Sequence, residues 1–177
     1  MNEPPWLTQP ALEVVVLLLG SHQAAFGRPL LAGIDPLVNP RQAAQEVFAA
    51  DQAVLAHDGS TDPRLIYANA AAIRLWRRPW EEMIGLPSRL TAEPQERLAR
   101  AEALAMAQQQ EALVGYAGIR VDREGRRFRI EGAKVWTLRD AGGSARGQAA
   151  CFASWWWLQS QLIKSSITDG QNANGGG

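Results

Sequence analysis

A group of charged side chains recurs at regular intervals in the segment PSRLTAEPQER. Arg89, Glu93 and Arg97 follow one another every four residues, with the hydroxyl side chains of Ser88 and Thr91 beside them. A guanidinium group presents a planar fork of donors that matches a carboxylate or a phosphate. This segment is therefore the first candidate for contacting an anionic ligand. The alternative is structural: both arginines pair with Glu93 and attach the loop to the helix that follows.

Three tryptophans form a second candidate group. Trp76, Trp80 and Trp136 are predicted to contribute to the wall of a central cavity, where each indole N–H needs a polar ligand, a water or a protein acceptor. This supply of indole rings would suit a planar ligand. The alternative is that the three side chains belong to an ordinary hydrophobic core.

Lys134 is a third candidate, because it interrupts an apolar face. Counting by two from Phe128 reaches Lys134 and then Trp136. An unbroken strand would therefore direct Lys134 into the cavity, as a counter-ion for a bound anion. Alternatively, Gly132 marks a β-bulge that shifts the alternation and turns Lys134 outward.

Other reactive side chains are few and scattered. Cys151 is the single cysteine, so neither an intrachain disulfide nor a thiolate zinc site is expected, and its apolar strand makes it a small hydrophobe. His22 and His57 are far apart and lack an acidic cluster, so no metal site is expected. His57 and Asp58 are adjacent, but no nucleophile is placed to complete a catalytic set. We therefore predict no catalytic residues.

Composition and charge limit the class of protein. The chain has 177 residues, of which 46% are hydrophobic and 20% charged, as expected for one globular domain. Eighteen basic and 18 acidic residues give zero formal net charge, which argues against nucleic acid as a direct partner and mildly favours self-association. The apolar run at 14–19 is shorter than the roughly 20 residues of a membrane span. Acidic residues flank it where a secretory signal is basic, so we expect a cytoplasmic protein without a membrane partner.

The first half of the chain is predicted to supply helices and two strands. Residues 1–10 contain three prolines and form an irregular lead-in, followed by a helix at 11–26 that is apolar on most sides and must be buried. A linker with further prolines leads to a short helix at 40–50. The runs QAVLAH and LIYA then form neighbouring antiparallel strands.

A helical region is predicted next. Asn69 caps a short helix, AAAIRLW, because its side-chain oxygen can accept a backbone N–H of the first turn. A second short helical segment follows. The longest helix runs from about Pro94 to 112, with the proline in its first turn, and Gly115 and Gly118 end it.

The last third of the chain is predicted to be all strand. A hairpin turns at Glu124-Gly125, with Val121 and Phe128 at alternating apolar positions. The final strand, GQAACFASWWWL, is apolar on both faces, so both faces must be covered. Helices cover one face, and the N-terminal helix or a second copy of the chain covers the other. Residues 165–177 are polar and glycine-rich and are predicted to be a disordered tail.

Several sequence segments, in this order, resemble those of the MEKHLA family, a PAS-related domain: YANAAAIRLW, PWEEMIGLPSR, TAEPQER, GIRVDREGRRFRIEGAKVW and GQAACFASWW. The resemblance implies an α+β, PAS-like fold. Its five-stranded antiparallel sheet would have helices over one face, the last strand in the middle and an extra N-terminal helix. It places the helix and linker at 11–40 and the PAS-like domain at 41–160.

The resemblance also implies a function. It predicts a non-enzymatic sensory or regulatory module that binds a small ligand or a protein partner. A homodimer would form through the N-terminal helix and the outer sheet face. The resemblance does not imply DNA binding, because the chain has no basic recognition helix and no zipper heptads. The ligand is not identified.

Two cofactors of PAS domains are argued against. The flavin photoreceptor branch has a cysteine in an Asn-Cys-Arg word on the helix that here reads AAAIRLW, so covalent flavin chemistry is not expected. In PAS sensors that bind haem, a histidine on the helices over the sheet coordinates the iron. Neither His22 nor His57 falls on such a predicted helix, so haem is not expected.

Two alternative functions stay open. One is a small α+β enzyme or isomerase with a cavity behind a curved sheet, for which Glu93, Lys134 and Tyr116 are the credible proton-transfer groups. The other is a dimerisation scaffold without a ligand, in which the N-terminal helix and Trp155 or Trp157 form the interface.

Overall fold

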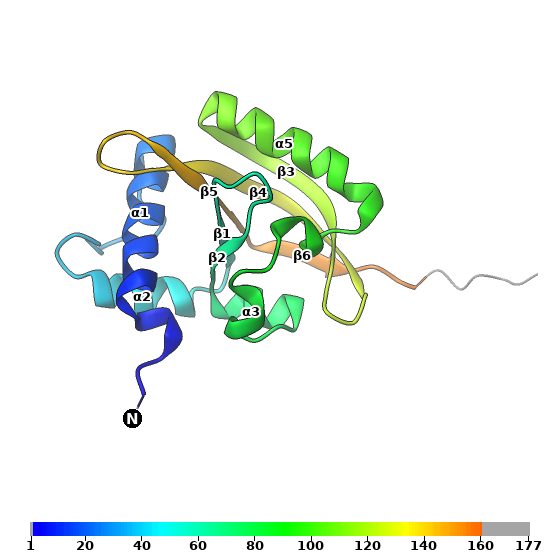
Figure 1. Cartoon of the computed structure of the whole chain (residues 1–177), viewed down its shortest axis with the longest axis horizontal. Helices are drawn as coiled ribbons and strands as arrows, with labels where there is room; N and C mark the ends of the chain where they lie inside the picture. The colour runs from blue at the N-terminus through cyan, green and yellow to red at the C-terminus, as the bar shows by residue number, and fades with distance from the viewer. Residues whose placement is uncertain (1, 161–177) are drawn as a thin grey trace, which may run out of the picture.

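The computed structural model of the chain describes residues 2–160, which form an antiparallel sheet with helices on both faces (Figure 1). The helices are α1 (Gln9–Phe26), α2 (Pro40–Ala49), α3 (Ala70–Trp76), α4 (Trp80–Met83) and α5 (Arg97–Gln110), with 3-10 turns at Pro5–Leu7, Ser88–Thr91 and Pro94–Glu96. The strands are β1 (Ala53–Asp58), β2 (Leu65–Ala68), β3 (Ala112–Val121), β4 (Arg127–Arg139), β5 (Ala145–Phe152) and β6 (Ser154–Trp157). The predicted tail at 165–177 lies outside the described residues.

The strand order is β2-β1-β5-β4-β3, and β6 also pairs with β4. The predicted α+β fold is confirmed, with β5 in the middle of the sheet. A sixth strand appears because the predicted final strand is interrupted at Ala153. Lys134 pairs with Cys151 of β5 and Glu131 pairs with Ser154 of β6, so β6 continues along β4 in the register of β5.

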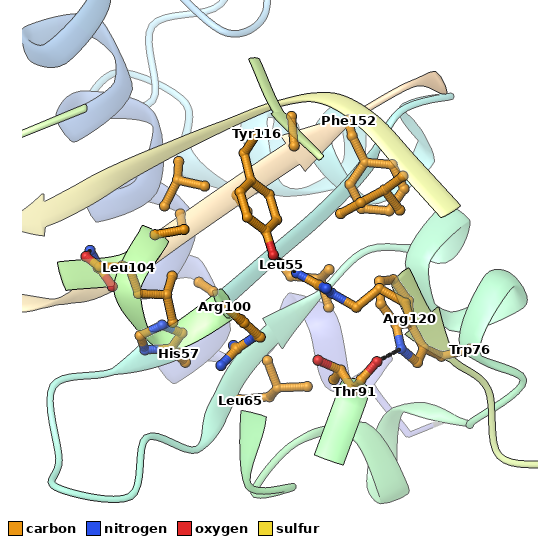
Figure 2. A pocket seen from close by; sticks show the side chains of 18 residues that line it. Leu55, His57, Leu65, Trp76, Thr91, Arg100, Leu104, Tyr116, Arg120 and Phe152 are labelled. Atoms are coloured by element: carbon orange, nitrogen blue, oxygen red, sulfur yellow. Dashed lines mark hydrogen bonds between the residues drawn. The ribbon is translucent and has the colours of Figure 1, made fainter. Parts of the chain in front are cut away.

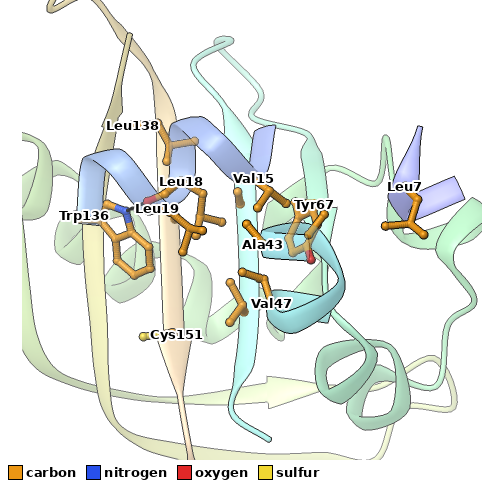
Figure 3. Close-up of a cluster of buried hydrophobic side chains, with 14 residues drawn as sticks. Leu7, Val15, Leu18, Leu19, Ala43, Val47, Tyr67, Trp136, Leu138 and Cys151 are labelled. Atoms are coloured by element: carbon orange, nitrogen blue, oxygen red, sulfur yellow. Dashed lines mark hydrogen bonds between the residues drawn. The ribbon is translucent and has the colours of Figure 1, made fainter. Parts of the chain in front are cut away.

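The N-terminal helices cover the outer face of the sheet. Figure 3 shows Val15 and Leu18 of α1 above Trp136 and Cys151, which are all buried. The Trp136 indole N–H donates to the Leu18 carbonyl at 3.2 Å, so α1 satisfies the buried polar atom of that side chain. The outer face of β1, β4 and β5 is therefore covered by the same chain rather than by a second copy.

The Asn69 side chain, at the start of α3, forms hydrogen bonds to α2, β1 and α3. Its side-chain oxygen accepts the backbone N–H of Ala72, which confirms the predicted cap, and that of Val54 in β1. Its amide nitrogen donates to the carbonyls of Val47 in α2 and Gln52 before β1. The side chain is fully buried, and every one of these bonds joins it to backbone.

Gly132 forms a bulge in β4, as predicted. Its φ of +64° lies in the left-handed region that glycine adopts without a steric penalty. Tyr116 pairs with Ala133 and Gly118 with Ile130, so β4 has one more residue than β3 over this interval. The alternation shifts, and Lys134 lies on the outer face with its ammonium group 5.3 Å from the centre of the Phe26 ring.

The predicted end of the longest helix is wrong. Helix α5 ends at Gln110, where Glu111 takes a left-handed conformation, and Gly115 and Gly118 lie inside β3. Strand β3 begins at once, because its first residues pair with β4, Leu113 opposite Val135. Tertiary pairing overrides the glycines as a local stop signal. Among the described residues, no helix is long and apolar enough to cross a membrane.

Candidate functional site

A small cavity of about 60 Å³ lies between the inner face of the sheet and α5 (Figure 2). Its wall is mostly apolar and includes Leu55, Leu65, Trp76, Leu104, Ile130, Ala133, Val135 and Phe152. Its polar groups come from His57, Thr91, Arg100, Tyr116, Arg120 and Gln148. An apolar pocket with a few convergent polar groups is the usual form of a small-molecule site.

Strand β3 places Tyr116 and Arg120 on the inner face. The two residues are separated by four positions, so the two-residue period of a strand puts them on one side. Arg120 is only 6% exposed and donates to the Tyr116 hydroxyl at 2.9 Å and to the Ile119 carbonyl at 2.9 Å. Between them, Gly118 leaves room for this contact, since a Cβ there would lie 2.7 Å from the Tyr116 oxygen.

Helix α5 contributes Arg100 to the opposite wall. Burial and the nearby charge of Arg120 lower the pKa of Arg100 to about 10, which leaves it a cation at neutral pH. Gln148 of β5 lies near it in the wall and donates to the Leu104 carbonyl at 2.8 Å, which attaches α5 to the sheet. Figure 2 shows Arg100, Arg120 and Tyr116 directed into the same space.

His57 lines the cavity and has one ring nitrogen without a partner among the described residues. Its Nδ1 lies 2.8 Å from the Asp58 carbonyl and donates to it, so Nε2 carries the lone pair. Nε2 is buried and has no hydrogen-bond partner among the described residues, and the side chain is 8% exposed. Burial lowers the pKa of His57, and the Arg100 charge lowers it further, so the ring is neutral at pH 7.

Aromatic side chains close one end of the cavity. The Trp76 ring packs edge-on against Phe128 at 5.1 Å and Phe152 at 6.1 Å. The indole N–H donates to the Thr91 carbonyl at 3.4 Å. Of the three tryptophans predicted to form the cavity wall, only Trp76 does so.

The predicted positions of Trp80 and Trp136 are wrong. Trp80 packs beside Trp6, Phe48 and Tyr67, away from the cavity. Trp136 lies beneath α1 on the outer face, because the bulge at Gly132 reverses which residues of β4 point inward. Lys134 faces outward for the same reason.

The charged loop residues lie outside the cavity as well. Arg89 pairs with Asp62 at 3.1 Å, and Glu93 pairs with Arg127 at 2.9 Å. The Arg97 Nε donates to the Arg89 carbonyl at 3.1 Å. The loop is thus attached as the structural alternative predicted, but through other partners, because two 3-10 turns interrupt the four-residue spacing.

The sequence patterns did not identify Arg100, Arg120, His57 and Gln148 as cavity residues. The signal for Arg120 is its four-residue spacing from Tyr116, two periods of a strand, which becomes visible only when β3 is known to begin at Ala112. Arg120 lies directly opposite Phe128, so Arg120 and not Val121 shares the inner face. No comparable local signal marks Arg100, whose role depends on how α5 crosses the sheet.

The proton-transfer groups considered for an enzyme do not meet. Tyr116 lines the cavity, whereas Lys134 lies on the outer face and Glu93 is paired with Arg127 outside it. Within residues 2–160, no group of three histidine, cysteine or carboxylate side chains is arranged to hold a metal ion.

Comparison with known families matches the MEKHLA domain over residues 12–157. No functionally curated protein matches the chain. Solved structures of similar fold include a PAS domain from Colwellia psychrerythraea, at 18% identity and a TM-score of 0.58, over 66% of this chain and 94% of that one.

Two light-oxygen-voltage structures also share the fold. One is an RNA-binding receptor at 23% identity and a TM-score of 0.57, where the match covers 71% of this chain and about a third, 35%, of the receptor. The other is a domain studied with a flavin analogue, at 18% identity and a TM-score of 0.52, over 73% of this chain and 89% of that one. Identities this low establish the fold alone.

A covalently attached flavin does not fit the residues of this cavity. Helix α3 reads AAAIRLW and carries no cysteine, and Cys151 lies on the opposite face of the sheet beneath α1. A cavity that holds a single benzene ring measures about 150 Å³, so a cavity of about 60 Å³ is far too small for a three-ring system.

Proposed function

The chain belongs to the MEKHLA domain family, and we propose that it is a non-catalytic sensory or regulatory module that binds a small molecule in the inner cavity. The observation that carries this proposal is the cavity itself, with polar groups from α5, β1, β3 and β5 converging on an apolar space. The cavity residues include no nucleophile paired with a base. This arrangement supports binding rather than catalysis.

Helix α5 is the element best suited to report on an occupied cavity. Ala107 is its only fully buried residue, while Arg100, Ala103 and Leu104 line the cavity. An element with few buried apolar contacts has a low free energy of local opening. A ligand that bridges α5 and the sheet would therefore change the stability of α5 more than that of the sheet.

Native mass spectrometry of protein purified from its own host tests this proposal. We expect the wild-type chain to carry a small molecule that is released on unfolding. Ala103→Leu fills the cavity and should abolish the retained mass, whereas Ala105→Leu, on the exposed side of the same helix, should keep it. A chain without a retained molecule, or equal retention by both variants, would contradict the proposal.

We also propose that the predicted homodimer uses the solvent side of α1. The outer sheet face is already covered, but Leu37 and Val38 are about 80% exposed, at 79% and 80%, and Leu37 borders an open groove along α1. Sedimentation velocity should show a dimer for the full chain and a monomer for Leu37→Asp. A monomeric wild-type chain would contradict the proposed homodimer.

A further inference from the structure

The two arginines of the cavity have no acidic partner among the described residues. All ten ion pairs formed by the described residues use arginines outside the cavity, such as Arg89 with Asp62 and Arg127 with Glu93. Arg100 and Arg120 take part in none of them, and no aspartate or glutamate lines the cavity. Two guanidinium groups thus face one space without a counter-ion from residues 2–160.

This arrangement is costly in the absence of an anion. A buried charge without a partner is destabilising, and two like charges near each other add to the cost. Arg120 has two hydrogen bonds, both to neutral groups of its own strand, and it is 6% exposed. No hydrogen bond to the Arg100 side chain is formed by the described residues. An anionic ligand would neutralise the charge and occupy these donors.

The rest of the cavity restricts what else the anion can contain. Apart from its polar groups, the wall is carbon, for example from Leu55, Ile130 and Phe152. An inorganic phosphate would leave this apolar surface uncovered. The space of about 60 Å³ restricts the ligand to a small molecule, and the apolar wall favours a short hydrocarbon chain beside the carboxylate.

We propose that the inner cavity binds a short-chain organic carboxylate, with the carboxylate between Arg100 and Arg120 and the hydrocarbon against Trp76, Ile130 and Phe152. This inference rests on the proposed function, since it names the ligand class of the same cavity. The ligand connects Arg100 of α5 to Arg120 of β3. Its binding therefore attaches α5, which has only one fully buried residue, more firmly to the sheet.

Thermal unfolding of the full chain with matched acid and amide probes tests the assignment. Sodium butyrate and butyramide differ only in charge at the polar end, and sodium chloride equalises the ionic strength. At ten times its Kd, butyrate should raise the Tm by about 4 °C, and butyramide should not raise it. Sodium phosphate at the same ionic strength should also have no effect.

Two arginine variants locate the effect. Arg100→Met should weaken butyrate binding about tenfold or more. Arg97→Met, one turn earlier on α5 and bonded to loop carbonyls, should leave it unchanged. Arg120→Met provides a second cavity variant, and far-UV circular dichroism checks that each variant is folded.

The outcomes separate this inference from the function on which it rests. Equal stabilisation by butyrate and butyramide, or full binding by Arg100→Met, would overturn the carboxylate assignment and leave small-molecule binding standing. Stabilisation by phosphate in place of butyrate would also overturn it. No response to any probe, together with a retained neutral molecule in the mass spectrum, overturns the carboxylate alone. No response and no retained molecule overturn both.

Discussion

Asn69 stabilises the fold through one fully buried amide that bonds to five backbone groups in and between α2, β1 and α3. Asn69→Ala removes all five bonds and leaves buried N–H and carbonyl groups unpaired. We expect the free energy of unfolding to fall by about 3 kcal/mol, measured by urea titration. Asn39→Ala is the matched control, because Asn39 caps α2 in the same way but is exposed, and its loss should cost about 1 kcal/mol. Similar losses for the two variants would contradict this role of Asn69.

The two buried histidines make stability depend on pH. Burial lowers the pKa of both His22 and His57 below the usual value of 6.5. Below pH 6.5 the unfolded chain therefore binds more protons than the folded chain, and stability falls as the pH decreases. From pH 7 to 5 the free energy of unfolding should decrease, by at most about 1.4 kcal/mol per pH unit for each histidine. Above pH 7 this contribution is fully present.

Urea titrations at several pH values check this dependence. The window above pH 5 isolates the histidines, because the carboxylates titrate lower. Other charged groups near them are Lys134 and Arg28 for His22, and Arg100 and Asp58 for His57. His57→Gln should reduce the slope, and adding His22→Gln should nearly remove it. An unchanged slope in the double variant would show that other groups cause it.

Individual residues were predictable where one local rule decides their position. Asn69 follows from capping chemistry, and the outward position of Lys134 follows from a glycine in a strand. Arg100 and Arg120 were not predictable in this way. Their meeting depends on the exact start of β3 and on the path of α5 across the sheet, which no short segment encodes.

At the scale of elements, the bulge in β4 determines which side chains face the cavity. Gly132→Ala places a Cβ on a residue with φ of +64°, where space is open but the conformation is strained. We expect a loss of about 1 kcal/mol in the free energy of unfolding, measured by urea titration. Gly20→Ala is the opposite control: Gly20 lies inside α1 with open space around it, so alanine should stabilise the chain by up to about 1 kcal/mol. A stabilising Gly132→Ala would mean that the bulge is absent.

Most elements were predictable from local patterns, and the exception is informative. Strand β2 and helices α1 and α2 follow apolar periodicity, prolines and caps. The boundary between α5 and β3 does not, because Gly115 and Gly118 read locally as the end of a helix. Pairing with β4 turns both into strand positions. Arg100 and Arg120, the cavity residues that the sequence did not reveal, lie on either side of this boundary.

At the scale of the whole molecule, α1 belongs to the same cooperative unit as the sheet. Val15 and Leu18 of α1 are fully buried against the outer face. Leu18→Ala should lower the free energy of unfolding by about 3 kcal/mol, and Leu17→Ala, which is only partly buried, by about 1 kcal/mol. Tryptophan fluorescence and far-UV circular dichroism should report one shared transition in urea. Two transitions, of which Leu18→Ala shifts only one, would make α1 a separate unit.

The sheet therefore has two faces with different roles. The outer face is filled by α1 and α2, and the inner face keeps a cavity with two arginines that lack a counter-ion among the described residues. We propose that a small molecule occupies this inner cavity, and a crystal structure of the chain purified from its own host is the direct test. We expect continuous density for a small molecule between Trp76, Arg100 and Arg120. A cavity that holds only separate water molecules would show that the proposal is wrong.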